Sequence, residues 1–404
     1  MNRKIITVIV VALALMLVFT RIGVRRLTPE PVHVPETAPQ EEREDETRGV
    51  VDQSENNDLT ELPDQEAEMI TFDELNFEIT VIAENLEVPW EIIPLPDEDD
   101  WLISQRYGVV TSLQHGSVLS IDEVAHTGEG GLLGMTLHPE FRTNRFIYFY
   151  YTTQRAGGLM NRIVRFQYEN QTFTNETLIL DNIPGHRVHN GGRLAFGPDG
   201  FLYATTGDAA VTSLSQDLDN LAGKILRMTE EGDVPDDNPY ENSFIYSYGH
   251  RNPQGLAWHP NFGTLFSSEH GPTRMDEINI IHPGKNYGWP EATCDDAPTE
   301  FEDPVSCYRD FTLAPSGMDF IDMERLDGTH LLVSGLRGGQ IRHLSLDEDG
   351  IPKKEQPLFT DYGRIRTVRY HEGAVYFVTN NRDGRGNPAP NDDRMFRVDL
   401  IATQ

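Results

Sequence analysis

The pattern of apolar positions indicates many short β-strands from about residue 75 to the end of the chain. Runs of five or six residues, rich in Val, Ile, Leu, Tyr and Phe, recur about 45 to 65 residues apart. Several follow a turn of the Pro-Asp-Gly type, as at Pro198–Gly200. Six units of about 55 residues each suit the four-stranded blades of a propeller. The six runs are Trp101–Gln105, Phe146–Tyr151, Phe201–Thr206, Thr264–Glu269, His330–Ser334 and Ala374–Thr379.

Helices should be minor, because no long stretch repeats with the helical period of 3.6 residues. A two-domain α/β enzyme would need alternating helices, which the pattern lacks. The sequence therefore predicts an all-β fold, a six-bladed β-propeller over residues 75–404.

Residues 1–27 have the pattern of an export signal peptide or a short signal anchor. Arg3 and Lys4 precede an apolar run over residues 5–20, and three arginines follow it. This run of 16 residues is shorter than the roughly 20 that span a bilayer, but no small-x-small cleavage site follows it. The pattern favours an uncleaved anchor, which would tether an extracytoplasmic (periplasmic or cell-surface) domain to the membrane.

Residues 28–70 are predicted to be a disordered acidic linker. Residues 28–69 contain 14 acidic and 2 basic residues and no Phe, Tyr or Trp. Such a segment cannot bury enough apolar surface to fold, and its like charges extend it.

The whole chain of 404 residues is strongly acidic, with 33 Lys and Arg against 65 Asp and Glu and a formal charge of −32. This balance excludes nucleic acid as a partner, because that binding depends on basic residues that neutralise phosphate. The chain also lacks a P-loop, an H-E-x-x-H and a G-x-S-x-G motif. ATP-binding, zinc-protease and serine-hydrolase functions therefore lose support.

A glycine-rich loop at residues 185–193 carries the first candidate chemistry. His189 in this loop and Asp208 after the next predicted strand would make a general base and the carboxylate that orients it. Taken alone, a histidine in such a turn more often satisfies a backbone group. His186 and His189 would also suit a metal pair, although their spacing by itself is weak evidence.

Four arginines lie in loops at predicted blade ends, in a chain that is poor in basic residues. Two of them are two positions apart and share one face of a strand. Together the four would hold a small polyanion by pairing with its carboxylates; the alternative for each is a surface salt bridge. They are Arg251, Arg337, Arg364 and Arg366.

Three further segments together supply exposed carbonyl groups, as at Gly-Pro, and nearby carboxylates. They are Glu269–Pro272, Asp276–Asn279 and Asn286–Pro290. Calcium prefers several oxygen ligands, so these segments suit Ca²⁺, although none is an EF-hand loop.

Several segments of the chain resemble the soluble quinoprotein sugar dehydrogenases, most closely the PQQ-dependent aldose sugar dehydrogenases. The resemblance covers about residues 75–404 and implies a six-bladed propeller. It also implies oxidation of aldose sugars at C1 to lactones, with PQQ and Ca²⁺ as cofactors and a quinone or a redox protein as electron acceptor. The segments that carry it are Gly131–Phe141, His189–Leu194, Gly197–Tyr203, Gly223–Arg227 and, most specifically, Gly249–Ala257 and Asn286–Pro290.

The resemblance implies a role for each matching residue. His189 matches the general base that takes the sugar hydroxyl proton, and Asp208 matches the acid that orients it. Arg251 matches the group that stabilises negative charge at the quinone. Residues that match cofactor contacts are Glu129, Arg251, Asn252, Thr312, Arg337, Arg364 and Arg366. Residues that match metal ligands are Gly271 and Pro272 for the catalytic Ca²⁺, and Glu277 and Tyr287 for a second, structural Ca²⁺.

Two positions depart from the family pattern. Glu129 stands where the family usually has Gln, and a carboxylate there repels an anionic cofactor unless it is protonated or paired. Val188 stands where the glucose-oxidising members have Asp, which puts a preference for glucose in doubt. Arg337 replaces a Lys of those members and keeps the charge.

The two cysteines fit an exported protein. Because the signal segment implies an oxidising compartment, Cys294 and Cys307 are predicted to form a disulfide; two free thiols are the alternative. Two other functions also stay open beside the dehydrogenase. A Ca²⁺-dependent propeller lactonase would cluster carboxylates around a central metal, where these loops offer arginines. A non-catalytic sugar-binding propeller would fit Glu129 and Val188.

Overall fold

The computed structural model describes residues 69–294 and 298–402. The chain divides into two units, residues 1–64 and 65–404, and all of the described residues belong to the second. The predicted signal or anchor at 1–27 and almost all of the predicted linker at 28–70 lie outside the described residues. Over the described ranges, no helix has both the length and the apolar character needed to cross a bilayer.

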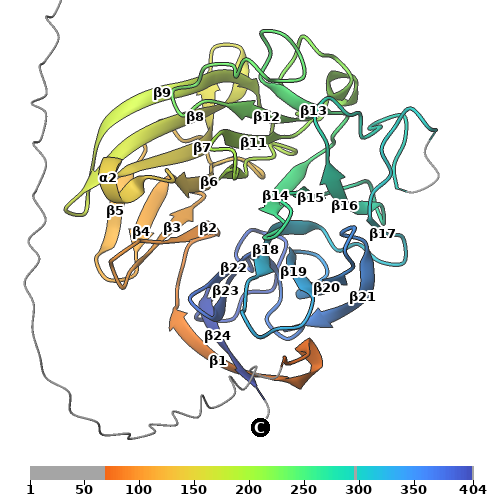
Figure 1. Ribbon diagram of the computed structural model, residues 1–404. Coiled ribbons are helices and arrows are strands. Elements are labelled where there is room, and N and C mark those ends of the chain that lie inside the picture. The colour runs from red at the N-terminus through yellow and green to blue at the C-terminus, as the bar shows by residue number, and fades with distance from the viewer. Residues whose placement is uncertain (1–68, 295–297, 403–404) are drawn as a thin grey trace, which may run out of the picture. The chain divides into compact units, whose positions relative to one another are not determined.

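The second unit is built from six four-stranded antiparallel sheets arranged in a ring (Figure 1). The first strand of each sheet contacts the first strand of the next sheet all the way around the ring. These sheets are the blades of a propeller, so the six-bladed all-β fold predicted from the sequence is confirmed.

The strands of each blade follow one another along the chain. Blade 1 contains β2 (Pro89–Pro94), β3 (Trp101–Gln105), β4 (Val109–Ser112) and β5 (Gly116–Ser120). Blade 2 contains β6 (Leu132–Leu137), β7 (Phe146–Arg155), β8 (Gly158–Glu169) and β9 (Thr172–Pro184). Blade 3 contains β10 (Leu194–Phe196), β11 (Leu202–Thr206), β12 (Lys224–Met228) and β13 (Ile245–Tyr248). Blade 4 contains β14 (Pro253–Trp258), β15 (Leu265–Glu269), β16 (Asp276–Ile281) and β17 (Ser306–Tyr308). Blade 5 contains β18 (Pro315–Ile321), β19 (Thr329–Gly335), β20 (Gln340–Leu346) and β21 (Pro352–Leu358).

Blade 6 joins the two ends of the described chain. It contains β22 (Ile365–His371), β23 (Ala374–Thr379), β24 (Met395–Ala402) and, outermost, β1 (Leu75–Ala83). Strand β1 pairs antiparallel with β24, from Leu75 opposite Ala402 to Val81 opposite Phe396. The ring is therefore closed by hydrogen bonds between its first and last strands.

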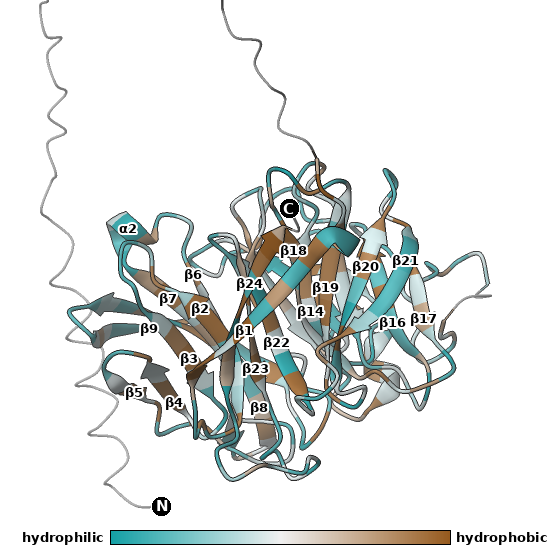
Figure 2. Ribbon diagram, turned by 90° about the horizontal axis from the view of Figure 1, so that it is seen from below, coloured by the Kyte–Doolittle hydropathy of each residue, from teal (hydrophilic) through white to brown (hydrophobic). Residues whose placement is uncertain are grey.

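The second strand of each blade coincides with one of the six apolar runs found in the sequence. Strands β3, β11, β15 and β23 are buried at every residue, because neighbouring blades cover both of their faces. The fourth strands β5 and β21 have no buried residue. Figure 2 shows the same contrast, with hydrophobic colour on β19 and hydrophilic colour on β21.

The core of the propeller consists of six apolar clusters, one at each interface between neighbouring blades. Between blades 1 and 2, for example, Leu102 packs with Phe149, and both side chains are fully buried. The clusters hold the blades at fixed angles and so fix where the loops at each end meet.

Helices are minor within the described residues, as predicted. They comprise one four-residue α-helix, α2 (Phe141–Asn144), and two 3₁₀ turns, η1 (Phe72–Glu74) and η2 (Thr212–Ser215). The packed chain also starts before residue 75. Ile70 forms a bridge with Leu326, and Phe72 is buried in the cluster between blades 5 and 6, because both apolar side chains lose water contact there.

Candidate active site

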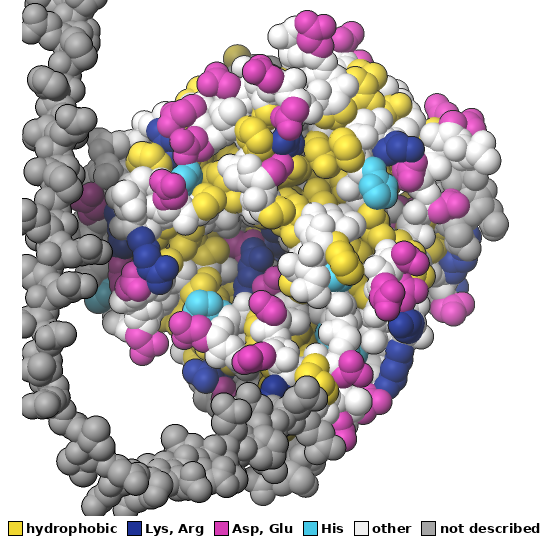
Figure 3. All heavy atoms as spheres, in the orientation of Figure 1, with side chains coloured by type: hydrophobic (Ala, Val, Ile, Leu, Met, Phe, Trp, Pro, Cys, Tyr) yellow, Lys and Arg dark blue, Asp and Glu magenta, His cyan; other side chains and the backbone are white. Residues whose placement is uncertain are grey.

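A cavity of about 650 Å³ lies where loops of all six blades meet. It is lined mainly by the loops between second and third strands and by the connections between blades, which lie at the same end of an antiparallel propeller. In the space-filling view, a hollow near the centre of the ring shows basic and acidic side chains within it (Figure 3). Nine of the predicted site residues line this cavity: Glu129, His189, Arg251, Gly271, Pro272, Thr312, Arg337, Arg364 and Arg366.

His189 is held by Asp208, which lies behind the cavity wall. Nδ1 of His189 is 2.8 Å from Oδ1 of Asp208, and Asp208 is fully buried. Since a carboxylate accepts hydrogen bonds, Nδ1 carries the proton of the neutral ring and Nε2 keeps its lone pair. Nε2 has no partner among the described residues, so a base faces the cavity.

Two further donors fix the carboxylate of Asp208. The backbone N–H of Ala210 donates to Oδ1 at 2.7 Å, and Nε1 of Trp289 donates to Oδ2 at 2.9 Å. Burial raises the pKa of Asp208, but the hydrogen bond and charge of His189, together with these donors, outweigh burial and lower it. Asp208 therefore stays ionised and orients the imidazole.

The cavity is positively charged within an acidic protein. Six arginines line it, against only Glu129, Asp276 and Asp383. Arg364 pairs with Asp383 at 2.7 Å, whereas the exposed side chain of Arg337 has no partner among the described residues. The cavity thus attracts anions.

Within the described residues, the guanidinium groups of Arg251 and Arg366 contact only neutral groups. Nη1 of Arg251 donates to the carbonyls of His270 and Gly271 at 3.0 and 2.9 Å. Arg366 donates to Gln254 at 2.8 Å and to Asn380 at 3.1 Å. The Nε atoms of both arginines are buried without a partner. Such unpartnered cationic donors fit an anionic ligand that completes their hydrogen bonds.

Asn252 lies just outside the cavity wall and supports it. Its Oδ1 accepts the N–H of Gly191 at 3.0 Å, while its Nδ2 is buried without a partner. It offers one more free donor next to Arg251.

The carbonyl groups predicted to bind Ca²⁺ lie in the loop between β15 and β16. Asp276 holds this loop, because its two oxygens accept the N–H groups of Gly271 at 3.1 Å and Ala314 at 2.9 Å. The carbonyl of Gly271 faces the guanidinium of Arg251, so it already points at a cation. The carbonyl of Pro272 accepts the N–H of Met275 at 3.0 Å, and Thr312 accepts the N–H of Arg274 at 3.3 Å.

Clusters of three or more His, Cys, Asp or Glu side chains that would hold a metal do not occur in the described ranges. The alternative metal pair of His186 and His189 therefore finds no further side-chain ligands there. Backbone carbonyls such as those of Gly271 and Pro272 are oxygen groups of the kind that calcium accepts as ligands.

Comparison with known proteins agrees with this geometry. The profile of the glucose/sorbosone dehydrogenase family matches residues 86–387, a range that contains every residue of the cavity wall. The chain belongs to the glucose/sorbosone dehydrogenase family. It is 33% identical over 338 residues to aldose sugar dehydrogenase YliI of Escherichia coli K12, covering 76% of this chain and 91% of that relative.

Members of this family with known structure share the propeller. The PQQ-bound aldose sugar dehydrogenase of Streptomyces coelicolor is 37% identical, with a TM-score of 0.74 over 81% of this chain and 99% of that chain. Quinoprotein glucose dehydrogenase B of Acinetobacter calcoaceticus is 36% identical over 252 residues, covering 53% of this chain and 52% of that relative.

The second site that the family resemblance implies lies behind the cavity. Glu277 and Tyr287 line a much smaller cavity together with Glu269. Glu277 accepts the N–H of Cys294 at 2.5 Å and Nδ2 of Asn279 at 3.2 Å. Burial and the charge of Glu269 raise the pKa of Glu277 to about 8. The phenol of Tyr287 donates to the carbonyl of Ile280 at 2.7 Å, so only its backbone is free to bind a cation.

Cys294 and Cys307 form a disulfide, which is the pairing that the sequence predicts. The bridge ties the segment before the gap in the described chain to strand β17, and it leaves no free cysteine among the described residues.

Several residues of the cavity wall were not among the site residues predicted from the sequence. Arg385 and Asp383 come from the loop between β23 and β24, and Arg106 comes from the loop between β3 and β4. His270 is also in the wall, and burial lowers its pKa to about 3, so it is a neutral donor or acceptor there. The signal for Arg385 was available, since it stands between two glycines in a loop at the same end of the propeller.

Proposed function

We propose that this protein is a PQQ-dependent dehydrogenase that oxidises aldose sugars at C1 to lactones, with His189 as the general base. The observation that carries the proposal is the His189–Asp208 pair at 2.8 Å beside arginines whose buried Nε atoms lack partners. The family relationship and the PQQ-bound relative support it.

The residues of the cavity would divide the work. His189 would take the proton of the C1 hydroxyl at Nε2 while Asp208 stabilises the resulting imidazolium. PQQ, when bound, supplies the quinone that accepts the hydride from C1. Arg251 would stabilise the negative charge that develops.

The remaining residues would hold the cofactors. Contacts to PQQ are assigned to Glu129, Asn252, Thr312, Arg337, Arg364 and Arg366 in addition to Arg251. The carbonyls of Gly271 and Pro272 would bind the catalytic Ca²⁺, and Glu277 with the backbone of Tyr287 would bind a structural Ca²⁺. Electrons would then pass to a quinone or a redox protein.

A lactonase is less well supported by the geometry. A Ca²⁺-dependent propeller hydrolase would cluster carboxylates at the centre of the ring, and the described residues offer arginines there instead. A non-catalytic sugar-binding propeller would have no need for the ordered His189–Asp208 pair.

The domain arrangement is also proposed. Residues 1–27 would export the chain and anchor it through the apolar run at 5–20, and residues 28–70 would act as a spacer. The Cys294–Cys307 disulfide supports an oxidising, extracytoplasmic location.

The test is an absorbance titration of the full-length protein with PQQ in the presence of Ca²⁺, followed by anaerobic addition of aldoses. Tight binding and reduction by a sugar would support the proposal. We expect the H189A variant to bind PQQ, and we expect its turnover number to fall about 10²–10⁴-fold. Lactone hydrolysis without PQQ, or sugar binding without any reduction, would contradict the proposal in favour of one of the two other functions.

A further inference from the structure

Glu129 brackets the segment that carries the proposed base. Its Oε2 accepts the backbone N–H of His189 at 3.0 Å, and its own backbone N–H donates to the carbonyl of Arg187 at 2.7 Å. One residue of the β5–β6 connection therefore holds both ends of the three-residue segment 187–189.

The bracketed backbone is in a conformation that needs support. His189 has a φ of 58°, which is the left-handed region that non-glycine residues rarely adopt. The two loops also touch closely, because a Cβ on Gly128 would lie 2.0 Å from the carbonyl oxygen of Arg187. The hydrogen bond from His189 to Glu129 helps to retain this conformation and with it the direction of the imidazole.

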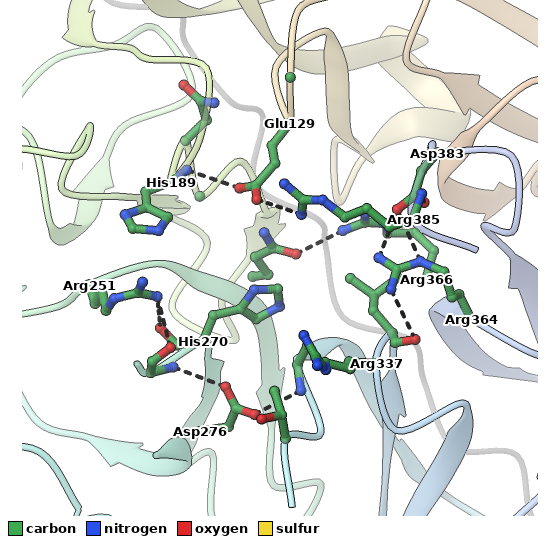
Figure 4. A pocket seen from close by; sticks show the side chains of 18 of the residues that line it. Glu129, His189, Arg251, His270, Asp276, Arg337, Arg364, Arg366, Asp383 and Arg385 are labelled. Atoms are coloured by element: carbon green, nitrogen blue, oxygen red, sulfur yellow. Dashed lines mark hydrogen bonds and ion pairs between the residues drawn. The ribbon is translucent and has the colours of Figure 1, made fainter. Parts of the chain in front are cut away.

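Arg385 holds the carboxylate of Glu129 from the opposite side. Its Nη1 is 2.7 Å from Oε1 of Glu129, so the two carboxylate oxygens serve two different blades. Figure 4 shows Arg385 and Glu129 meeting between His189 and the group of Arg364, Arg366 and Asp383. The ion pair thus links the β23–β24 loop of blade 6 to Glu129, which in turn holds the backbone N–H of the base.

The carboxylate of Glu129 is ionised rather than protonated. Burial raises its pKa, but the hydrogen bonds from His189 and Arg385 outweigh burial and lower the pKa to about 2. The repulsion of an anionic cofactor that the sequence suggested at this position is therefore offset by Arg385.

We propose that Glu129 and Arg385 form a positioning pair for His189. Glu129 holds the left-handed backbone of the base, and Arg385 keeps the carboxylate in place and neutralises it. This inference rests on the proposed function only for the statement that His189 is the base; the effect on the geometry of His189 is independent of it.

The first experiment uses the full-length protein without PQQ or sugar. In protein labelled with ¹⁵N and with [¹³C]histidine, NMR would record the His189 amide and ring signals, assigned with H189Q. We expect E129A to shift the His189 amide signal most, because it removes the acceptor of that N–H. R385Q, which frees the carboxylate of Glu129, should shift the same signals by a smaller amount.

The second experiment compares turnover after reconstitution with PQQ and Ca²⁺. E129A loses both the charge and the acceptor for the His189 N–H, and we expect a fall in kcat of about 10–100-fold with a much smaller change in KM. E129Q retains an acceptor oxygen and should recover most of this loss. R142Q removes an ion pair between exposed side chains, Arg142 and Asp97 at 2.6 Å, and serves as a control that leaves kcat unchanged.

Unchanged His189 amide and ring signals in both E129A and R385Q would overturn the positioning pair. Equal losses of kcat in E129A and E129Q, with intact His189 signals, would overturn it as well. Arg385 is half exposed, so R385Q is expected to fold even if E129A does not. Absence of any PQQ-dependent activity in the unmodified protein would reject the proposed function, while the shifts of the His189 signals would still decide the pairing.

Discussion

Two arginines buried at the centre of the propeller, Arg193 and Arg366, differ in what neutralises them. Both contact Gln254, Arg193 through the backbone carbonyl at 2.8 Å and Arg366 through the side-chain Oε1 at 2.8 Å. Arg193 forms an ion pair with the fully buried Glu91, which also pairs with Arg369 at 2.9 Å. Arg366 contacts no carboxylate of the described residues.

The difference separates an arginine with a counter-ion among the described residues from one without. Burial lowers the pKa of Arg193 to about 10 and that of Arg366 to about 9, so both remain cationic at neutral pH. A buried cation is stable only with a counter-ion or a full set of hydrogen bonds. Arg193 has its counter-ion within the protein, and Arg366 lines the cavity, where a bound anion would supply it.

The largest effect is expected from E91A. This change leaves Arg193 buried without its carboxylate and removes the ion pair of Arg369, and it should lower the free energy of unfolding by about 3–5 kcal/mol. Urea unfolding followed by tryptophan fluorescence would measure the loss. D97A, which removes the exposed partner of Arg142, should change stability by less than about 0.5 kcal/mol. A loss below about 1 kcal/mol for E91A would show that Glu91 is not the essential counter-ion.

R366Q is expected to act on binding rather than on folding. No carboxylate contacts Arg366, so its removal strands no buried charge, and stability should stay within about 1 kcal/mol. The affinity for PQQ should fall about 10–100-fold, because a hydrogen bond to a charged group contributes about 1.5–3 kcal/mol. Calorimetric titration with PQQ measures this. If R366Q lost as much stability as E91A and kept its affinity for PQQ, Arg366 would be a structural cation like Arg193.

The sequence predicts those parts of the fold that are buried on two sides. The six apolar runs correspond to second strands because neighbouring blades cover both of their faces. Strand β10 spans only Leu194–Phe196, and β21 is polar over its centre, residues 353–356, so neither gives a pattern of its own. The pairing of β1 with β24 depends on ring closure, which no local pattern encodes.

Prediction of the cavity from the sequence is limited in the same way. Arg251, Arg364 and Arg366 stand out in the sequence as arginines at blade ends, and the structure brings them to one cavity. Arg385 lies in a long loop whose position depends on the closure of blade 6, so its contact with Glu129 is evident only in three dimensions. Asp208 and Asn252 lie behind the wall and act through His189 and Gly191, which spacing alone cannot show.

The two buried carboxylates Glu91 and Asp208 also differ in the groups that hold them. The W289F variant tests this difference. Asp208 is as completely buried as Glu91, but its partners are His189, Trp289 and a backbone N–H instead of arginines. Loss of the Trp289 donor should raise the pKa of Asp208, loosen its hold on His189 and lower kcat about tenfold. W258F makes the same change in the cluster between blades 3 and 4 and should leave kcat unchanged. Equal kcat for W289F and the unmodified protein would mean that His189 and the N–H of Ala210 are enough to hold Asp208.

The smallest effect is expected where a Glu–Arg pair is open to solvent. Arg385 is 53% exposed and its partner Glu129 is 19% exposed, in contrast to Glu91 and Arg193. R385Q should therefore cost less than about 1 kcal/mol of stability at pH 7. The pKa of Glu129 falls from its ordinary value of 4.5 to about 2 in the folded protein, so the stabilisation is present above pH 4.5 and is lost as the pH falls toward 2. Urea unfolding of both proteins between pH 7 and 2.5 should show their stability difference shrinking over this range. A difference that stays constant down to pH 2.5 would mean that Arg385 stabilises the fold through contacts other than its ion pair with Glu129.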